Sequence, residues 1–538
     1  MAKKKTTRTR QTKSDDWAKQ SCKCLSGKSS KAKTFNPGKI AKSIMATKQL
    51  LRTPSPSTTG YPISREDFDK LKNASGQKRV TKKKCTKTRD TAKKTQEMAK
   101  LLGKKAALPA QAFPAAAPTP AGNFEGIKAT GWLPPDCTAA TGPDHVLLSV
   151  NSSVAIYTRS GTQKLQRTLT QWFGNVITGS TIFDPKLLYD QYEGRFVLVA
   201  VARNNSAKTS SFLISVSATS DPTGMWHNYR MDAKKDGNTS TNNWADYPAI
   251  GIDDKALYIS ANMFKFAGGF SYVKVRVIPK AAPYSGGTIA FTDLVNLKNQ
   301  DGSLAFTVQP CHQFGSPGSM SLVNSLFPTG RSLTLWSLND PLGTPALSRR
   351  TVSTDAYSLP PNAAQKGNND PLNTGDVRML HAVVRDGAVW CAMTTAEDWN
   401  TSTTVAAIHW FQINATSGTL VQQGVYGASG FHYFYPAITP DANGSMVIVF
   451  SRCSPTEFAS IRYTGRRATD SVGQLQNSAL LKSGEANYVG KDTGGRNRWG
   501  DYAGISLDPI NSRTVWFYSM YADKPANTWG TWVGSAAF

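Results

Sequence analysis

The 416 residues from position 123 to the end predict an all-β fold, a seven-bladed β-propeller with six or eight blades as alternatives. Short apolar runs of six to nine residues alternate there with Gly, Asn, Asp, Pro and Ser, as strands and turns do. No long stretch has the apolar period of a helix, and a seven-residue motif recurs along the chain. A jelly roll needs no repeat and a β-solenoid needs much shorter repeats, so a propeller is favoured.

The recurring motif is clearest in three segments. Tyr247–Asp253 (YPAIGID), Tyr435–Asp441 (YPAITPD) and Tyr502–Asp508 (YAGISLD) each read Tyr, Pro or Ala, a small residue, Ile, two variable residues and Asp. A turn and an apolar run follow each copy. Each copy therefore predicts the start of an inner strand in a separate blade, with the Asp capping backbone N–H groups of the next turn.

Looser copies of the motif supply the remaining blades. Leu380–Asp386 (LHAVVRD) and Asp184–Asp190 (DPKLLYD) keep the closing Asp and lead into the apolar runs AVWCAMT and FVLVAVA. The long interval between the copies at 247 and 380 leaves room for one degenerate unit around 316–336. The run VLLSVN at 146–151 adds one more, and the total of seven units gives the predicted number of blades.

Residues 1–105 differ from the rest of the chain in charge. They hold 30 of the 63 Lys and Arg but only 7 of the 36 Asp and Glu, a net charge of +23, whereas the remaining residues carry +4. A segment this polar cannot form a core, so a disordered polybasic arm is predicted. Ala and Pro make up 12 of residues 106–122, which predicts an extended linker to the propeller at 123–538. The clustered basic residues are Lys3, Lys4, Lys5, Arg8, Arg10, Lys78, Arg79, Lys82, Lys83, Lys84, Lys87 and Arg89.

The arm favours nucleic acid or another polyanion as a partner, because basic side chains that neutralise phosphates release counterions. It contains few aromatic residues, so contacts with the phosphate backbone are expected rather than base stacking. The arm resembles the packaging arms of viral coat proteins, which implies a virion or nucleoprotein component. A nuclear-localisation tract and a solubilising tail are the alternatives.

The sequence also bears on location. No stretch approaches the 18 uninterrupted apolar residues that a membrane-spanning helix requires. The start MAKKKTTRTRQ is not followed by the apolar run of a secretory signal peptide. A virion or the nucleus is therefore expected rather than secretion, while the host, the oligomeric state and the pairing of the cysteines stay open.

Five segments of the body share features with one group of proteins. They are PPDCTAATGPDHVLLSVN (134–151), FDPKLLYDQYEGRFVLVAV (183–201), ISVSATSDPTGMWHNY (214–229), DYPAIGIDDKALYISANMF (246–264) and RWGDYAGISLDP (498–509). In these segments the chain resembles exported bacterial-type β-propeller proteins of the sialidase-like superfamily. The resemblance implies a propeller whose loops bind protein or glycan. It does not imply an activity, because this fold hosts hydrolases, lectins and binding scaffolds.

One short stretch is similar to the Asp-box that tightens hairpin turns in sialidases. Thr219, Asp221, Gly224 and Trp226 follow that pattern, except that the glycine comes one position later. Asp-boxes are structural, so the stretch supports the fold and not catalysis.

A sialidase-like hydrolase requires three arginines for the substrate carboxylate, a Tyr nucleophile with an acidic partner, and an Asp acid/base, all at the propeller axis. The Tyr and Asp candidates recur with the motif, which favours structural roles for them, whereas Arg378 and Arg498 are better candidates for ligand contact. If the protein is an enzyme, its catalytic candidates are Asp246, Tyr502, Arg378, Arg498 and Asp501. Further candidates for the ligand-binding face are Asp184, Tyr247, His381 and Tyr435.

Cofactor signals are weak. The six histidines form no HxH or HExxH pair, so no metal site is predicted. The loop DGNTSTNNWAD at 236–246 has oxygen ligands suited to Ca²⁺, but its spacing fits no EF-hand. The sequence therefore favours a non-enzymatic structural or interaction protein without a cofactor. A sialidase-like glycoside hydrolase or a glycan-binding lectin is the alternative.

Overall fold

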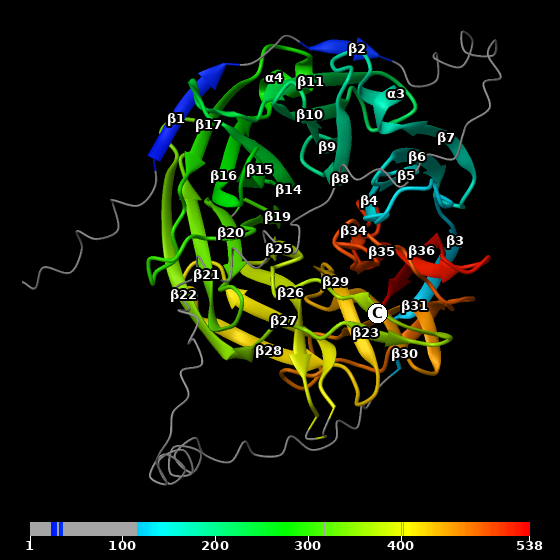
Figure 1. The fold of residues 1–538 in the computed structure, drawn as a ribbon. Coiled ribbons are helices and arrows are strands. Elements are labelled where there is room, and N and C mark those ends of the chain that lie inside the picture. The colour runs from blue at the N-terminus through cyan, green and yellow to red at the C-terminus, as the bar shows by residue number, and fades with distance from the viewer. Residues whose placement is uncertain (1–22, 29–31, 36–115, 317, 400, 402) are drawn as a thin grey trace, which may run out of the picture.

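The computed structural model describes residues 23–28, 32–35, 116–316, 318–399, 401 and 403–538. Their strands form antiparallel sheets that follow one another around a ring, so the prediction of an all-β propeller is confirmed (Figure 1). Strand pairing in the described part gives one ten-stranded sheet, one five-stranded sheet, four four-stranded sheets and two smaller ones. When the ten-stranded sheet is divided at β19 (His312–Gln313), and β1 (Lys23–Lys28), β2 (Lys33–Phe35) and the two smaller sheets are set aside, seven sets of four strands remain, which we call blades and number in chain order.

The first blade contains β4 (Thr138–Thr141), β5 (His145–Val150), β6 (Ser153–Thr158) and β7 (Gln163–Thr168). The second contains β8 (Thr181–Asp190), β9 (Arg195–Asn204), β10 (Thr209–Ser217) and β11 (Trp226–Asp232). The third contains β14 (Asn243–Ile252), β15 (Ala256–Lys265), β16 (Phe270–Pro279) and β17 (Ala290–Val295). The fourth contains β18 (Gln309–Pro310), β20 (Met320–Ser325), β21 (Gly330–Asn339) and β22 (Ala346–Tyr357).

The fifth blade contains β25 (His381–Arg385), β26 (Ala388–Glu397), β27 (Val405–Asn414) and β28 (Leu420–Tyr426). The sixth contains β29 (His432–Pro440), β30 (Met446–Ser454), β31 (Glu457–Arg466) and β32 (Ala479–Lys482). The seventh contains β34 (Gly504–Leu507), β35 (Thr514–Asp523), β36 (Thr528–Ala537) and β3 (Thr119–Glu125). In this last blade the earliest strand of the body pairs with the latest one, which closes the ring.

Short elements fill the spaces between blades. They are α3 (Leu169–Phe173), α4 (Ala281–Ser285), β12 (Lys235–Asp236), β13 (Thr239–Ser240), β19 (His312–Gln313), β23 (Ala363–Gln365), β24 (Asn368–Asn373) and β33 (Asn497–Arg498). Strand β19 pairs in parallel with β14 and β25 and so joins the third and fifth blades near the axis. Neither helix of the described ranges has the length and apolar character that a membrane crossing requires.

The closing aspartates of the motif cap turns, as predicted. Asp253 Oδ1 accepts hydrogen bonds from the N–H groups of Lys255 and Ala256. Asp441 Oδ1 accepts from the N–H groups at 443 and 445, and Asp508 Oδ1 from those at 510 and 511. The repeated Asp is therefore a turn residue, because its carboxylate satisfies N–H groups that the strands leave unpaired.

The motif starts differ in detail from the prediction. Tyr247 and Tyr435 lie within β14 and β29, and Tyr502 precedes β34, so these tyrosines do not mark strand starts. The backbone φ angle is positive at three motif positions: 49° at Tyr247, 53° at Tyr435 and 50° at Asp184. The register of each inner strand shifts at these positions. Each is thus a β-bulge, which turns the local chain and redirects the side chain.

The Asp-box-like stretch forms the turn between β10 and β11. Asp221 Oδ1 accepts from the backbone N–H and the hydroxyl of Thr223. The indole of Trp226 donates to Pro222 O at 2.8 Å and packs edge-on against Trp172, with 4.9 Å between ring centroids. The stretch therefore has a structural role in this turn.

Two parts of the predicted arm form strands, contrary to the expectation that the whole arm is disordered. Strand β1 (Lys23–Lys28) pairs along its length with β17, and β2 (Lys33–Phe35) pairs with β11. They extend two blades at the outer rim of the ring (Figure 1). Strand β3 also begins at Thr119, inside the predicted linker 106–122. The twelve clustered basic residues lie outside the described residues.

Candidate functional site

The structure brings most of the predicted site residues together at the propeller axis. Asp184 lies in β8, Asp246 and Tyr247 in β14, Tyr435 in β29, and Arg498 in β33. All of them are buried, as are the nearby residues that precede β25 and β34. We call this group the axial cluster; it comprises Asp136, Asp184, Lys186, Asp246, Tyr247, Asp376, Arg378, Tyr435, Arg498, Asp501 and Tyr502.

The tyrosines of the axial cluster tie neighbouring segments together. Tyr247 donates its hydroxyl to Asp501 O at 3.3 Å, and Tyr502 donates to Pro185 O at 3.2 Å. Tyr435 donates to Asn373 O at 3.3 Å. Burial raises the pKa of all three hydroxyls well above their usual range. A hydroxyl that donates to a backbone carbonyl and resists ionisation is a poor nucleophile, because no base accepts its proton.

Both predicted arginines are neutralised within the cluster. Arg378 donates from Nε to Asp376 Oδ1 at 2.8 Å and from Nη2 to Asp376 Oδ2 at 2.6 Å. Arg498 Nη2 lies 2.7 Å from Asp501 Oδ2. Burial alone would lower the pKa of each guanidinium, but these carboxylates raise it. The two positive charges therefore already have internal carboxylate partners, while Arg378 Nη1 and Arg498 Nε and Nη1 make no hydrogen bond among the described residues.

Sequence reasoning missed three members of the cluster. Asp136, Lys186 and Asp376 lie outside the first position of the motif, and no repeat marks them. The ammonium of Lys186 lies 2.9 Å from the ring centroid of Tyr502. Burial lowers the pKa of Lys186 to about 7, although Asp184 and Asp136 oppose this shift.

The carboxylates form a chain of links between blades. Asp136 accepts from the Asn151 amide at 2.9 Å and from the backbone N–H of Asp501 at 2.8 Å. Asn151 Oδ1 accepts from the backbone N–H of Asp184 at 2.6 Å, and Asp184 in turn accepts from Tyr247 N–H at 3.1 Å. Burial and the neighbouring Asp501 raise the pKa of Asp184 to about 7. These contacts hold the first, second, third and seventh blades in register at the axis.

Asp246 stands apart from this chain of links. Its side chain is fully buried, and neither carboxylate oxygen has a hydrogen-bond partner among the described residues. Burial and the charge of Asp184 raise its pKa well above the usual value. A buried carboxyl without a partner is stable only in its neutral form, so Asp246 retains its proton in the folded protein at pH values where an exposed Asp is ionised.

We expect the substitution Asp246→Asn to stabilise the protein at pH 8 and to have almost no effect at pH 4. The folded-state pKa of Asp246 lies above its unfolded value, so its contribution to stability is intact below the unfolded pKa and is lost as the pH rises through the folded pKa. Asn mimics the protonated form and avoids an unfavourable term of about 1–3 kcal/mol at high pH. Thermal unfolding at both pH values measures the difference. The exposed Asp254→Asn is the control, and a larger effect of Asp246→Asn at pH 4 would contradict the assignment.

The axis holds a narrow cavity of about 50 Å³. Lys186, His312, His381 and the start of β34 contribute to its lining. His381 Nδ1 lies 2.8 Å from Ile438 O, so this nitrogen carries a proton. Burial lowers the pKa of both histidines to about 4, which leaves them neutral at physiological pH. His381, predicted for the ligand-binding face, thus reaches the axial channel, but the channel is far smaller than a typical ligand pocket of roughly 300 Å³.

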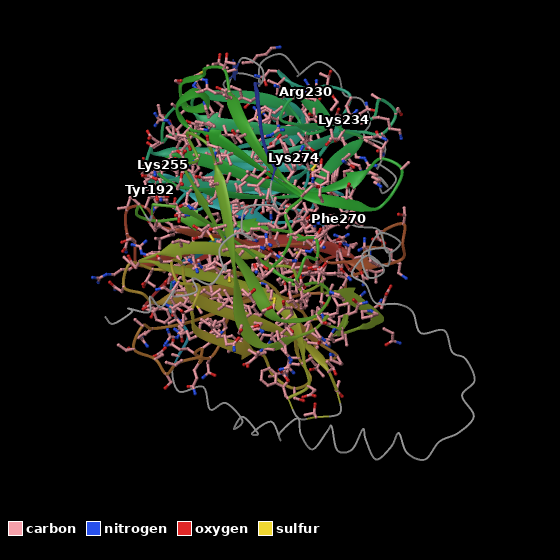
Figure 2. All side chains as sticks on the ribbon, turned by 90° about the vertical axis from the view of Figure 1, so that its left-hand side faces the viewer. Tyr192, Arg230, Lys234, Lys255, Phe270 and Lys274 are labelled. Carbon is pink, nitrogen blue, oxygen red and sulfur yellow. The ribbon has the colours of Figure 1, made fainter. Side chains whose placement is uncertain are left out.

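The loop considered for Ca²⁺ does not gather its acidic residues. Asp236 accepts from the hydroxyl of Tyr272 at 2.7 Å and lies 2.8 Å from the ammonium of Lys274, which is buried. Lys274 belongs to β16 of the third blade and is labelled in Figure 2. Asp246, at the other end of the loop, belongs to the axial cluster. Across the described ranges, no group of three or more His, Cys, Asp and Glu side chains is arranged to hold a metal ion.

Comparisons with known proteins give similarities of structure only. No family model and no curated protein matches this chain. The sialidase of Trypanosoma rangeli in complex with sialic acid is 12% identical, over 74% of this chain and 60% of its own, with a TM-score of 0.36. A Hadza microbial sialidase is 13% identical over 73% of each chain, with a TM-score of 0.36. The WD40 domain of SCAP from fission yeast is 10% identical, over 75% of this chain and 82% of its own, with a TM-score of 0.33. Such low values indicate nothing about activity, and the propeller assignment rests on the strand order of this chain.

Proposed function

We propose that this chain is a non-enzymatic structural or interaction protein. Its basic arm binds nucleic acid or another polyanion, and its propeller presents a surface to proteins or glycans. The specific form of the proposal is a component of a virion or nucleoprotein, located in the virion or the nucleus. The observation that carries the non-enzymatic part is that both axial arginines are paired with buried carboxylates of the chain itself.

These pairs argue against binding of a substrate carboxylate at the axis. Arg378 and Arg498 are 9% and 1% exposed, and a substrate would have to displace Asp376 and Asp501 from them. Breaking a buried pair leaves an uncompensated charge, which costs about 3–5 kcal/mol. The tyrosine hydroxyls are engaged with backbone carbonyls, and the axial cavity of about 50 Å³ has no room for a sugar ring. The cluster therefore serves as an internal brace between blades.

Binding to a polyanion is supported by the charge distribution. The net charge of +23 in residues 1–105 contrasts with +4 in the remaining residues. A concentrated positive charge of this kind gives strong, salt-sensitive and sequence-independent attraction to phosphates. The propeller is nearly neutral in comparison, so its surface suits partners that are recognised by shape and hydrogen bonds.

A sialidase-like glycoside hydrolase, or a lectin of that fold, is the second candidate, because Asp, Tyr and two Arg side chains lie together at the axis. We expect the purified full-length protein to release no fluorophore from a fluorogenic sialoside above the rate of a buffer blank. Tyr463, a buried tyrosine of the sixth blade, provides the control. If Tyr502→Phe abolishes turnover and Tyr463→Phe does not, the protein is a hydrolase instead. Turnover unchanged by Tyr502→Phe would indicate a contaminating enzyme or a site elsewhere, and would argue against a hydrolase whose nucleophile is Tyr502.

A further inference from the structure

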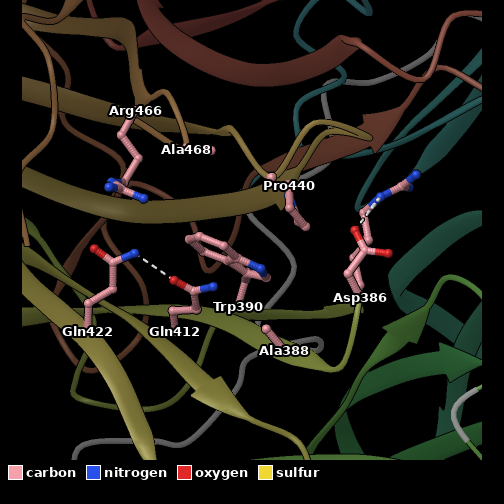
Figure 3. Close-up of a pocket in the computed structure, with 10 residues that line it drawn as sticks. Asp386, Ala388, Trp390, Gln412, Gln422, Pro440, Arg466 and Ala468 are labelled. Atoms are coloured by element: carbon pink, nitrogen blue, oxygen red, sulfur yellow. Dashed lines mark hydrogen bonds and ion pairs between the residues drawn. The ribbon is translucent and has the colours of Figure 1, made fainter. Parts of the chain in front are cut away.

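A second cavity lies away from the axis, between the fifth and sixth blades. Its volume is about 220 Å³, more than four times that of the axial channel. Strands β25 to β28 form one wall, and β29, β31 and the turn after β29 form the other (Figure 3). The side chains that line it include Arg385, Asp386, Trp390, Gln412, Gln422 and Arg466.

Arg466 is the unusual member of this lining. Four arginines of the described body are buried, and three of them, Arg276, Arg378 and Arg498, form ion pairs with carboxylates at 2.6–2.7 Å. Arg466 is 3% exposed and forms no ion pair with a carboxylate among the described residues, although the charge of nearby Asp470 opposes the lowering of its pKa by burial. Its Nη2 donates to Asp470 O at 2.7 Å, and its Nε, like Nη1 of Arg378 and Nε of Arg498, makes no hydrogen bond there, so the missing ion pair is what sets Arg466 apart. A buried guanidinium without a direct ion pair is costly, and an anion in the cavity would supply that ion pair.

The other polar groups of the cavity are mostly donors. Gln422 Nε2 donates to Gln412 Oε1 at 2.6 Å, and Gln422 Oε1 accepts from Gly473 N–H at 3.0 Å. These bonds occupy both amide oxygens and leave the NH₂ group of Gln412 available. The guanidinium of Arg385 adds further donors, and its Nε lies 3.6 Å from a carboxylate oxygen of Asp386. Asp386 is the acidic residue of the lining, and its side chain is 76% exposed.

We propose that this cavity between the fifth and sixth blades binds the oxyanion group of a small molecule, a carboxylate or a phosphate monoester. A planar guanidinium donates two parallel hydrogen bonds to either group, and Gln412 provides a third donor. The cavity volume of about 220 Å³ suits a ligand no larger than a monosaccharide derivative. The proposal concerns a separate site and does not depend on the arm or on the axial cluster.

Isothermal titration of the full-length protein at 150 mM salt tests the proposal with three probes of similar size. They are glucuronate, which carries a carboxylate, glucose 6-phosphate, which carries a phosphate, and uncharged glucose. We expect at least one of the two anions to bind at least tenfold more tightly than glucose, and the preferred anion identifies the chemical source. Failure of both anions to bind better than glucose would overturn the proposal.

Variants separate the cavity from the basic arm, which also attracts anions. Arg466→Gln should weaken anion binding at least tenfold. Arg467→Gln, at the exposed neighbouring residue, should change anion binding less than twofold because Arg467 does not line the cavity. The arm is intact in both variants, so it cannot account for a difference between them. Gln412→Glu should also abolish anion binding, since its carboxylate occupies the cavity, while raising the thermal stability by pairing with a guanidinium. This increase in stability distinguishes lost binding from misfolding. Equal effects of Arg466→Gln and Arg467→Gln would overturn the proposal, as would tight anion binding by Gln412→Glu.

Discussion

Replacing the twelve clustered basic residues of the arm by glutamine is expected to halve the salt dependence of nucleic-acid binding and to weaken binding at least a hundredfold at 50 mM salt. The substitutions lower the net charge of residues 1–105 from +23 to +11, and the slope of log K against log salt follows the number of phosphates neutralised. The unaltered protein should lose about 10³–10⁵ in affinity between 50 and 200 mM salt if it contacts six to ten phosphates. Fluorescence anisotropy with a labelled RNA and a labelled DNA of unrelated sequences measures both quantities.

The glutamine variant is a better test than a deletion of the arm. Deleting residues 1–105 would also remove β1 and β2 and expose the edges of β17 and β11, which favours aggregation. A matched control replaces twelve exposed Lys and Arg residues of the propeller by glutamine and should retain most of the affinity. The reverse result, with the propeller substitutions causing the larger loss, would place the nucleic-acid contact on the propeller.

The substitution Arg498→Met is expected to destabilise the protein by about 3–5 kcal/mol, because it leaves Asp501 as an uncompensated charge in the axial cluster. Urea unfolding followed by tryptophan fluorescence measures the change in free energy. Arg331→Met, at an exposed position of β21, should stay within about 0.5 kcal/mol of the unaltered protein.

A second substitution isolates the charge effect from the loss of packing. Adding Asp501→Asn to Arg498→Met removes the uncompensated charge and should restore at least half of the lost stability. If the double variant is as unstable as Arg498→Met alone, the packing of the Arg498 side chain stabilises the fold and its ion pair does not. The same pair of variants also distinguishes a brace from a substrate-binding arginine, which can be removed without a large loss of stability.

The repeat in the sequence predicted the fold because the same physical requirement recurs in several blades. In the third, sixth and seventh blades the inner strand is followed by a turn whose N–H groups need an acceptor, and Asp253, Asp441 and Asp508 provide it. The tyrosines were placed less accurately. A β-bulge at Tyr247 or Tyr435 depends on how the neighbouring strand pairs, and pairing partners are not visible in a single sequence.

The residues of the candidate site also divide into those that the sequence predicted and those that it did not. Residues of the motif, such as Asp184 and Tyr247, were identified because they repeat. Asp136, Lys186 and Asp376 occur once, and their role follows only from the contacts that the closed ring creates. Strands β1 and β2 were not predicted for another reason. They join the sheets through backbone hydrogen bonds at an edge, which require no apolar alternation in the added strand.

The pairing of β3 with β36 has a consequence for synthesis of the chain on the ribosome. Trp532 donates to Asn123 Oδ1 across 409 residues of sequence. At about 5–20 residues per second, roughly 20–80 s pass between translation of the two strands. Strand β3 must stay unpaired during this time while the intervening blades are made. Ring closure is therefore a late, long-range step that follows completion of the last strand, and the half-finished protein exposes an open blade to other nascent chains.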